Sequence, residues 1–344
     1  MRVLGRKRIG RLVFGLFVAL GCGCKRDIAP PIVKCATDFV THNLKNCSFT
    51  STQINGRDYA SPTSNPNNGN EFAVVEDGRL IKFNIATSEK TVLVEGLDRL
   101  LTPDWGASGW IVFSAGWKIW KVNENGSGLE QITFGPREIW LEFNPAGDRI
   151  VYPRNMDLGF EYDQNPSLRD LNKMIVISLH GNPIDSFCRF FDENLCHPWE
   201  YCSWSKEDEI AAEYRPNSDK RGIAIYDLNG QIKSIPYSFE KPKRKGEPFI
   251  TDIEWHPTNG RIYFQDSRGL HWLDPSKEKT KRLRTSCADE FYEDFTITSD
   301  GEYIIAIRGE ATADKDACTI TEERYVVRMK TDGGKEERIF IPPW

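Results

Sequence analysis

The chain has 344 residues, of which 45 are basic and 50 acidic, and its formal net charge is −5. It carries no extended basic stripe, so composition argues against nucleic acid as a partner. Its nine cysteines include no Cys-x-x-Cys pair, which indicates disulfides in an oxidising compartment rather than metal ligands.

Residues 1–21 are typical of a secretory signal. Five basic residues and no acidic residue are followed by an apolar run over residues 12–23. That run is well short of the roughly 20 residues that a membrane-spanning helix requires. We predict that residues 1–21 are removed on export, which takes five basic residues and changes the formal charge from −5 to about −10.

The segment at residues 18–27 resembles a bacterial lipobox, in which a cysteine after a small residue is acylated. Cys22 is the better candidate because Gly21 precedes it and Ala19 lies three residues before it, and Cys24 is the alternative. An acylated cysteine would hold the protein at a membrane surface without a spanning helix. The other interpretation is a cleaved signal that leaves a soluble periplasmic protein.

A polar stretch follows the cysteines. Residues 22–70 are rich in Asn, Ser, Thr and Pro, which predicts a lipidated N-terminus and a tether. From residue 71 onward, short β-rich runs alternate with Gly, Asp and Asn. We therefore expect the folded domain over residues 71–344.

A repeat begins in this second region. An aromatic residue, a polar turn and an apolar strand occupy residues 143–152. Copies of varying fidelity start at Trp105, Trp204 and Trp255 and near Phe295. Successive leading aromatics are separated by 38, 61, 51 and 40 residues, close to the roughly 40 to 50 of propeller blades, and insertions at 153–172 and 186–200 fall in the longest interval.

A second signal follows each copy. Alternating apolar residues run into turns that often contain Asn-Gly or Asp-Gly, as at residues 223–230 and 325–334. Alternation indicates half-buried strands, and these turns favour hairpins. Together with a first unit over residues 71–94, the pattern predicts an all-β fold: a single β-propeller of six blades with four antiparallel strands each. Five or seven blades are the alternatives.

These repeats resemble those of TolB-type propellers, most legibly over residues 101–152. The resemblance implies the fold, whereas the same repeat serves many functions. About 45 residues precede the first predicted blade, too few for the N-terminal α/β domain of TolB itself. A lipobox joined to such a propeller is more similar to envelope lipoproteins of the Bacteroidota type.

Catalytic signatures are missing from the sequence. It contains no Gly-x-Ser-x-Gly, His-Glu-x-x-His, Walker or Gly-x-Gly-x-x-Gly motif, so we predict no enzymatic activity, no cofactor and no metal. Asp314 and Asp316 have the spacing of a calcium-loop start, but Cys318 and Thr319 occupy a ligand position and the glycine position, which favours a solvated loop.

The histidines allow one further alternative. The oligogalacturonate lyases, a TolB-like branch, use a histidine-containing metal site, and His197 and His256 lie near the starts of predicted inner strands. The competing interpretation is that these histidines cap turns or pack against aromatic rings.

Acidic residues recur immediately before the blade aromatics, with Ser203 as the exception. Together with nearby aromatic residues they predict an acidic, aromatic channel mouth that suits a protein segment with Lys or Arg, or a sugar stacked on rings. The alternative is that the acids only cap strand ends. The candidate residues are Asp104, Trp140, Glu142, Trp199, Glu200, Asp252, Glu254, Tyr292 and Asp294.

Proximity in the sequence or in the repeat suggests three disulfides. The expected pairs are Cys35 with Cys47, Cys188 with Cys196, and Cys287 with Cys318. Cys202 lies in a predicted inner strand, where we expect a free buried thiol.

These observations predict a non-catalytic, lipid-anchored protein of the bacterial cell envelope. It would sit on the outer membrane facing the periplasm, held only by its lipid, and use a propeller face as a scaffold or as a subunit of an outer-membrane complex. Its partners would be envelope or outer-membrane proteins. The alternative function is a glycan-binding or glycan-cleaving propeller like the oligogalacturonate lyases.

Overall fold

The computed structural model describes residues 51–135, 138–154, 173–187, 190–192, 195–196, 201–217, 220–240, 250–287, 289–314 and 318–343. These residues belong to one compact unit and contain strands and turns but no helix, so none of them forms a helix able to span a bilayer. The all-β prediction is confirmed.

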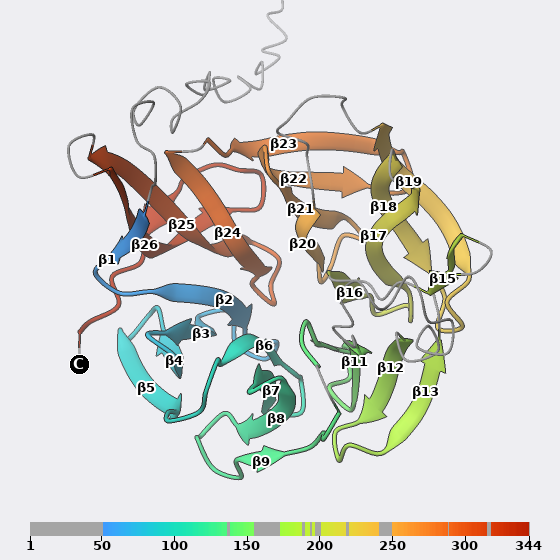
Figure 1. The fold of residues 1–344 in the computed structure, drawn as a ribbon, viewed down its shortest axis with the longest axis horizontal. Helices are drawn as coiled ribbons and strands as arrows, with labels where there is room; N and C mark the ends of the chain where they lie inside the picture. Colours follow the sequence, from blue (N-terminus) through green and yellow to red (C-terminus); the bar gives the residue numbers. More distant parts are fainter. Residues whose placement is uncertain are drawn as a thin grey trace, which may run out of the picture. The chain divides into compact units, whose positions relative to one another are not determined.

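Six of the sheets formed by the described strands are blades of the predicted kind, antiparallel throughout except for the parallel pairing of β1 (Ser51–Asn55) with β26 (Thr319–Lys330) (Figure 1). Each of the first three blades is a four-stranded meander in chain order. Blade 1 contains β2 (Tyr59–Ser64), β3 (Glu71–Glu76), β4 (Arg79–Asn84) and β5 (Glu89–Val94); blade 2 contains β6 (Leu101–Trp105), β7 (Trp110–Ala115), β8 (Lys118–Asn123) and β9 (Glu130–Gln131); blade 3 contains β10 (Glu142–Phe143), β11 (Arg149–Arg154), β12 (Lys173–Ser178) and β13 (Pro183–Phe187).

The remaining blades follow the same plan after a small two-stranded sheet of β14 (Phe190–Asp192) and β15 (Leu195–Cys196). Blade 4 contains β16 (Cys202–Trp204), β17 (Ile210–Asn217), β18 (Lys220–Tyr226) and β19 (Ile232–Glu240); blade 5 contains β20 (Ile250–Trp255), β21 (Ile262–Asp266), β22 (Gly269–Asp274) and β23 (Lys279–Thr285); blade 6 contains β24 (Glu290–Ile297), β25 (Tyr303–Asp314) and β26 (Thr319–Lys330), with β1 (Ser51–Asn55) and β27 (Glu337–Arg338) beside β26.

The first strand of each blade contacts the first strands of both neighbouring blades. The contacts run from β2 to β6, β10, β16, β20 and β24, and β24 returns to β2. This closed circle of inner strands around a common axis defines a β-propeller with six blades, as predicted (Figure 1).

Strand alternation explains why the blades stack. In β7, Ile111 and Phe113 enter the apolar cluster shared with blade 1, whereas Val112 between them enters the cluster shared with blade 3. Successive side chains point to opposite faces of a strand, so a strand that is apolar throughout can serve two neighbours. Among the described residues, six such clusters lie at the six junctions between blades.

The ring closes between blades 6 and 1, where both ends of the described chain meet. β1 pairs in parallel with residues 319–323 of β26, and β27 pairs antiparallel with residues 327 and 328. The following segment then packs Ile339 and Ile341 into the cluster between blades 6 and 1. Closure therefore uses strands from both ends of the chain.

A buried ion-pair group holds the C-terminal segment on blade 1. Arg57 donates a hydrogen bond to the carbonyl oxygen of Ile341 over 2.7 Å, and Lys90 donates to that of Pro342 over 3.0 Å. The buried carboxylate of Glu76 lies 2.6 Å from Arg57 and 2.5 Å from Lys90, so it orients both cations.

The domain boundary expected at residue 71 lies inside blade 1. The inner strand β2 occupies residues 59–64, and residues 65–70 form its turn to β3. The segment predicted as a tether therefore contributes β1 and β2 to the propeller. Its Asn-rich and Pro-rich composition is that of a tight hairpin turn as much as of a linker.

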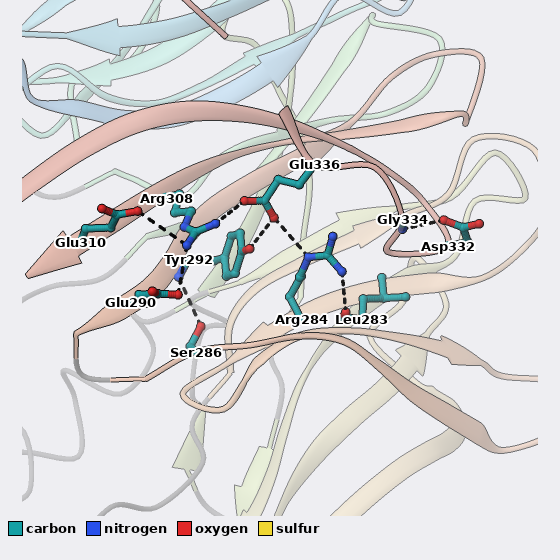
Figure 2. Close-up of polar contacts among 10 residues, drawn as sticks. All are labelled: Leu283, Arg284, Ser286, Glu290, Tyr292, Arg308, Glu310, Asp332, Gly334 and Glu336. Atoms are coloured by element: carbon teal, nitrogen blue, oxygen red, sulfur yellow. Dashed lines mark hydrogen bonds and ion pairs between the residues drawn. The ribbon is translucent and has the colours of Figure 1, made fainter. Parts of the chain in front are cut away.

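Blades 5 and 6 are also joined by a polar network around Glu336 (Figure 2). Its carboxylate accepts hydrogen bonds from the Tyr292 hydroxyl over 2.6 Å, from Arg284 of β23 over 3.1 Å, and from Arg308 of β25. Arg308 also pairs with Glu290, 3.0 Å away. One half-buried carboxylate thus connects three strands of two blades.

Candidate functional site

The same turn follows the inner strand in every blade, which fixes how the six blades correspond. The backbone nitrogen of the first turn residue donates to the carbonyl of the residue that starts the next strand or just precedes it, as Asn144 does to Arg149 over 2.9 Å. The equivalent turn residues are Asn65, Gly106, Asn144, Ser205, His256 and Thr298. This alignment places Ile297, and not Phe295, at the position of Trp105.

Six side chains, each two residues before the turn residue, face the propeller axis and form what we call the axial ring. Most of them accept a hydrogen bond from a backbone nitrogen of the next blade: Thr63 from Trp105 over 3.1 Å, Asp104 from Phe143 over 2.5 Å, Ser203 from Trp255 over 2.9 Å, Glu254 from Ile297 over 2.9 Å, and Thr296 from Ser64 over 3.2 Å. The sixth member, Glu142, accepts from the Ser203 hydroxyl over 3.2 Å.

A second set of six, the mouth ring, lies two residues earlier in the chain, on the inner strand or just before it. It consists of Ser61, Thr102, Trp140, Tyr201, Asp252 and Asp294. Four members have left-handed backbone angles, with φ of 48° at Ser61, 43° at Thr102, 54° at Trp140 and 31° at Asp294. Irregularities in strand register coincide with the mouth ring in β2, β6, β20 and β24. Such bulges redirect side chains, here at the entrance to the axis.

Two cavities of about 280 Å³ each lie along the axis. The mouth cavity is lined by the mouth ring and by the axial ring except Ser203, and the turn-side cavity by the whole axial ring and the turns. Both share Thr63, Asp104, Glu142, Glu254 and Thr296. The axial ring is therefore the level at which the two ends of the channel meet.

The mouth cavity is strongly acidic. The described residues that line it include five carboxylic acids, Asp104, Glu142, Asp252, Glu254 and Asp294, and no Lys, Arg or His. Six of the nine residues predicted for the channel mouth, these five acids and Trp140, thus line one cavity. The structure assigns Asp252 and Asp294 to the mouth ring and the other three acids to the axial ring, so Asp294 is not the blade equivalent of Asp104.

Enclosure changes the protonation of these acids. Burial, and then the carboxylates of Asp104, Glu254 and Asp252, raise the pKa of Glu142 well above its ordinary value. Burial, followed by the charge of Asp294, raises the pKa of Asp252 to about 8. Burial likewise raises the pKa values of Asp104, Glu254 and Asp294, although hydrogen bonds to each oppose it. The cavity therefore favours proton uptake or a cationic occupant.

Aromatic rings cover another part of the mouth cavity. Trp140 and Tyr201, from blades 3 and 4, both line it, and their ring centroids lie 6.0 Å apart at an angle of 53°. Both residues are only partly buried. The cavity thus combines a carboxylate wall with an apolar one.

Other predicted site residues lie elsewhere. Tyr292 is buried between blades 5 and 6, where it donates to Glu336, and it does not line the mouth cavity. Trp199 and Glu200 lie outside the described residues, and so do His197, Cys22 and Cys24.

Some of the cysteines lie within the described residues and others lie outside them. Cys202 is a free buried thiol, as predicted. Cys287 and Cys318 are both disulfide-bonded, and their bond to each other stays a prediction. Cys35, Cys47, Cys188 and the side chain of Cys196 lie outside the described residues.

His256 has a structural role in the turns. Its Nε2 lies 3.0 Å from the carbonyl oxygen of Gly301 in blade 6, and its Nδ1 accepts from the backbone nitrogens of Thr258 and Asn259. This is the turn capping that was one of the two interpretations of the histidines. Within the described part of the chain, no three Asp, Glu, His or Cys residues are grouped so as to hold a metal ion.

Three members of the axial ring are not among the residues predicted from the sequence, namely Thr63, Ser203 and Thr296. Their common property is a side-chain oxygen two residues before a tight turn, which hydroxyls provide as well as carboxylates. The signal for Thr63 was present, because Asn65-Pro66-Asn67-Asn68-Gly69-Asn70 matches the turn at residues 144–148. Because these residues were predicted to be a tether, the sixth copy of the turn, which belongs to blade 1, was not predicted.

Comparison with solved structures supports the propeller fold. No family model and no curated protein matches the chain. Among solved structures, a protein described as a TolB from Agrobacterium tumefaciens is similar with a TM-score of 0.53 and 16% identity, over 75% of this chain and 86% of that one. TolB from Acinetobacter baumannii is similar with a TM-score of 0.53 and 15% identity, over 83% of this chain and 63% of that one.

The fold and the axial rings define a six-bladed β-propeller with an acidic central channel. The propellers of the two TolB proteins are similar to it in fold. At these identities the likeness concerns the fold alone.

Proposed function

We propose that this protein is a non-catalytic scaffold of the bacterial cell envelope that holds a protein partner at the mouth cavity. The observation that carries the proposal is the mouth cavity itself, where five acids and two aromatic rings project from a closed circle of inner strands. A site held by six rigid blades can bind with little ordering cost. The TolB-type fold supports an envelope location.

The proposal includes the N-terminal anchor. An export signal followed by Cys22 favours acylation, and the polar chain that follows gives the propeller reach from the membrane surface. Labelling cells with an alkyne fatty acid tests this part. We expect label on the full-length protein and its loss in Cys22→Ala, with Cys24→Ala as the matched control; equal label in both variants would contradict acylation at Cys22.

Partner binding is tested by crosslinking in intact envelopes, followed by purification of the full chain and mass spectrometry. We expect a protein partner that is recovered with the native chain and lost with Trp140→Asn, because asparagine tolerates the left-handed backbone at this position while removing the ring. Phe134→Asn, which alters an 80% exposed ring away from the mouth, is the control. Absence of any partner of the native chain would overturn the scaffold proposal.

The pair of rings at the mouth also favours one second candidate, a glycan-binding propeller. Trp140 and Tyr201 provide apolar surface beside carboxylates that can accept hydrogen bonds from sugar hydroxyls. A glycan array with acidic and neutral oligosaccharides separates the two functions. Binding of a glycan that Trp140→Asn abolishes would favour this second function, and the absence of binding to any glycan on the array would rule it out.

A further inference from the structure

The mouth cavity lacks a counter-charge. Five acids line it, and the described lining residues include no base. The charge of Arg324 acts on Asp294, but its guanidinium pairs with the neighbouring Glu293 over 3.3 Å. Acids enclosed in this way must either hold protons or meet a cation from outside the fold.

The acids differ in how far the protein itself satisfies them. Asp104 accepts from two backbone nitrogens and the Thr63 hydroxyl, and Asp252 accepts from the backbone nitrogens of Phe295 and Ile253. Within the described residues, Glu142 accepts one hydrogen bond, from Ser203. After burial, three neighbouring carboxylates raise the pKa of Glu142: Asp104 and Glu254 of the axial ring and Asp252 of the mouth ring. Glu142 is therefore the acid most in need of a further partner.

Unpaired polar atoms beside the axial ring provide an independent indication of an occupant. Ser64 is 8% exposed and lines the turn-side cavity, and its hydroxyl has no hydrogen-bond partner among the described residues. The indole nitrogen of Trp105, 3% exposed and lining the same cavity, also has none. Buried polar groups are normally paired. The indole nitrogen can only donate and belongs to the apolar cluster between blades 1 and 2, whereas the Ser64 hydroxyl can accept from a cation, so the hydroxyl is the atom that favours a cationic occupant along the axis.

We infer that the axial channel binds an ammonium or guanidinium group carried on an apolar stem, with Glu142 as its main acceptor. The stem would lie against Trp140 and Tyr201, and the charged end would reach the carboxylates. The source is either a lysine or arginine side chain of a partner or a free alkylamine. This inference rests on the proposed function, because it names the group that the scaffold would accept.

Binding should release protons. The groups that face Glu142 are Asp104 of β6, Asp252 and Glu254 of β20 and the Cys202 thiol of β16, with Asp294 of β24 next to Asp252. All of them are acids, so a bound cation lowers their proton affinity. Affinity should therefore rise with pH until the ligand amine itself loses its proton.

The test is calorimetric titration of the full chain with Nα-acetyl-lysine amide, with Nα-acetyl-norleucine amide as the matched neutral probe and n-butylamine as the free amine. Titration in two buffers of different ionisation heat counts released protons. We expect the lysine probe to bind with proton release, the norleucine probe not to bind, and Glu142→Gln to weaken lysine binding at least about tenfold. Glu95→Gln, with a carboxylate that is 68% exposed, is the control.

The outcomes separate the possibilities. Binding of the lysine probe alone indicates a side chain as the source, and equal binding of n-butylamine indicates a free amine. No binding, equal binding of the norleucine probe, or undiminished binding by a folded Glu142→Gln would overturn the inference; so would Ca²⁺ binding that excludes the lysine probe. If Glu142→Gln does not fold, proton release by the native chain decides.

Failure of this inference is distinguishable from failure of the scaffold proposal. A crosslinked partner without any amine binding would retain the scaffold and remove the cation site. Amine binding without a partner would retain the cation site as a receptor for free amines and remove the scaffold.

Discussion

The carboxylate of Glu254 in blade 5 accepts a hydrogen bond from the backbone nitrogen of Ile297 in blade 6, over 2.9 Å. The same relationship joins Thr63 to Trp105 and Asp104 to Phe143. These side chains therefore connect neighbouring inner strands and also face the axial cavity. The acids of the axial ring thus hold neighbouring blades together and also make the channel acidic.

Loss of one link in the axial ring should destabilise the propeller. Ser203→Ala removes the acceptor of the Trp255 backbone nitrogen and the donor to Glu142. A buried donor without a partner costs about 1–3 kcal/mol, which is the expected loss in the free energy of unfolding. Urea denaturation measures it. Ser299→Ala, at a turn of the same propeller, is the control, and equal stability of both variants would contradict a structural role for the ring.

The free energy of unfolding should fall as pH rises between the pKa values that Asp252 has in the unfolded chain and in the folded protein. Its pKa is about 8 in the folded protein and has the ordinary value near 3.8 in the unfolded chain. The folded state holds this proton more tightly, so the stabilisation is complete below about pH 4 and is lost as pH approaches 8. Between these values each such group lowers stability by up to about 1.4 kcal/mol per pH unit.

Asp252→Asn isolates this effect because asparagine has no titrating proton. We expect the native chain to lose stability relative to Asp252→Asn when urea denaturation is compared at about pH 5 and about pH 8. The exposed Asp98→Asn should show no such difference. A constant gap between the native chain and Asp252→Asn at both pH values would show that Asp252 is ionised throughout.

The carboxylate network between blades 5 and 6 should contribute more than a surface ion pair. Glu336→Ala leaves Arg284, Arg308 and Tyr292 without a shared acceptor that is 14% exposed (Figure 2). We expect a loss of about 1–3 kcal/mol in the free energy of unfolding. Glu323→Ala, which breaks an exposed pair with Arg338, should cost less than about 1 kcal/mol. Similar losses in both would assign Glu336 a surface role.

The C-terminal segment should be required for ring closure. Ile341 is 2% exposed in the cluster between blades 6 and 1, whereas the adjacent Phe340 is 74% exposed. Ile341→Ala should cost about 2–5 kcal/mol, because it leaves a cavity in that cluster. Phe340→Ala should change stability by less than about 0.5 kcal/mol. Thermal unfolding of the two variants compares neighbouring residues directly, and equal midpoints would show that the segment does not hold the ring.

Local patterning was enough to predict the blades. Residues 143–152 and 255–264 carry the polar turn and the apolar strand that follows it, and both form as predicted. Each blade is a hairpin meander whose period and turns depend on neighbouring residues, so the information is local. For the same reason residues 59–70 were wrongly predicted to belong to a tether, because the sequence of a short polar turn does not differ from that of a linker when its partner strand is not recognised.

The sequence by itself determined that the chain makes repeated four-stranded sheets, since alternating runs and Asn-Gly or Asp-Gly turns are local signals of hairpins. Only the tertiary structure decided that Glu142, Asp252 and Glu254 meet in one cavity, that Ser203 links two of the blades, and that β1 and Ile341 close the ring. These relationships join segments about 50 to 280 positions apart, often through backbone N–H groups that every residue type except proline possesses, so no local pattern encodes them.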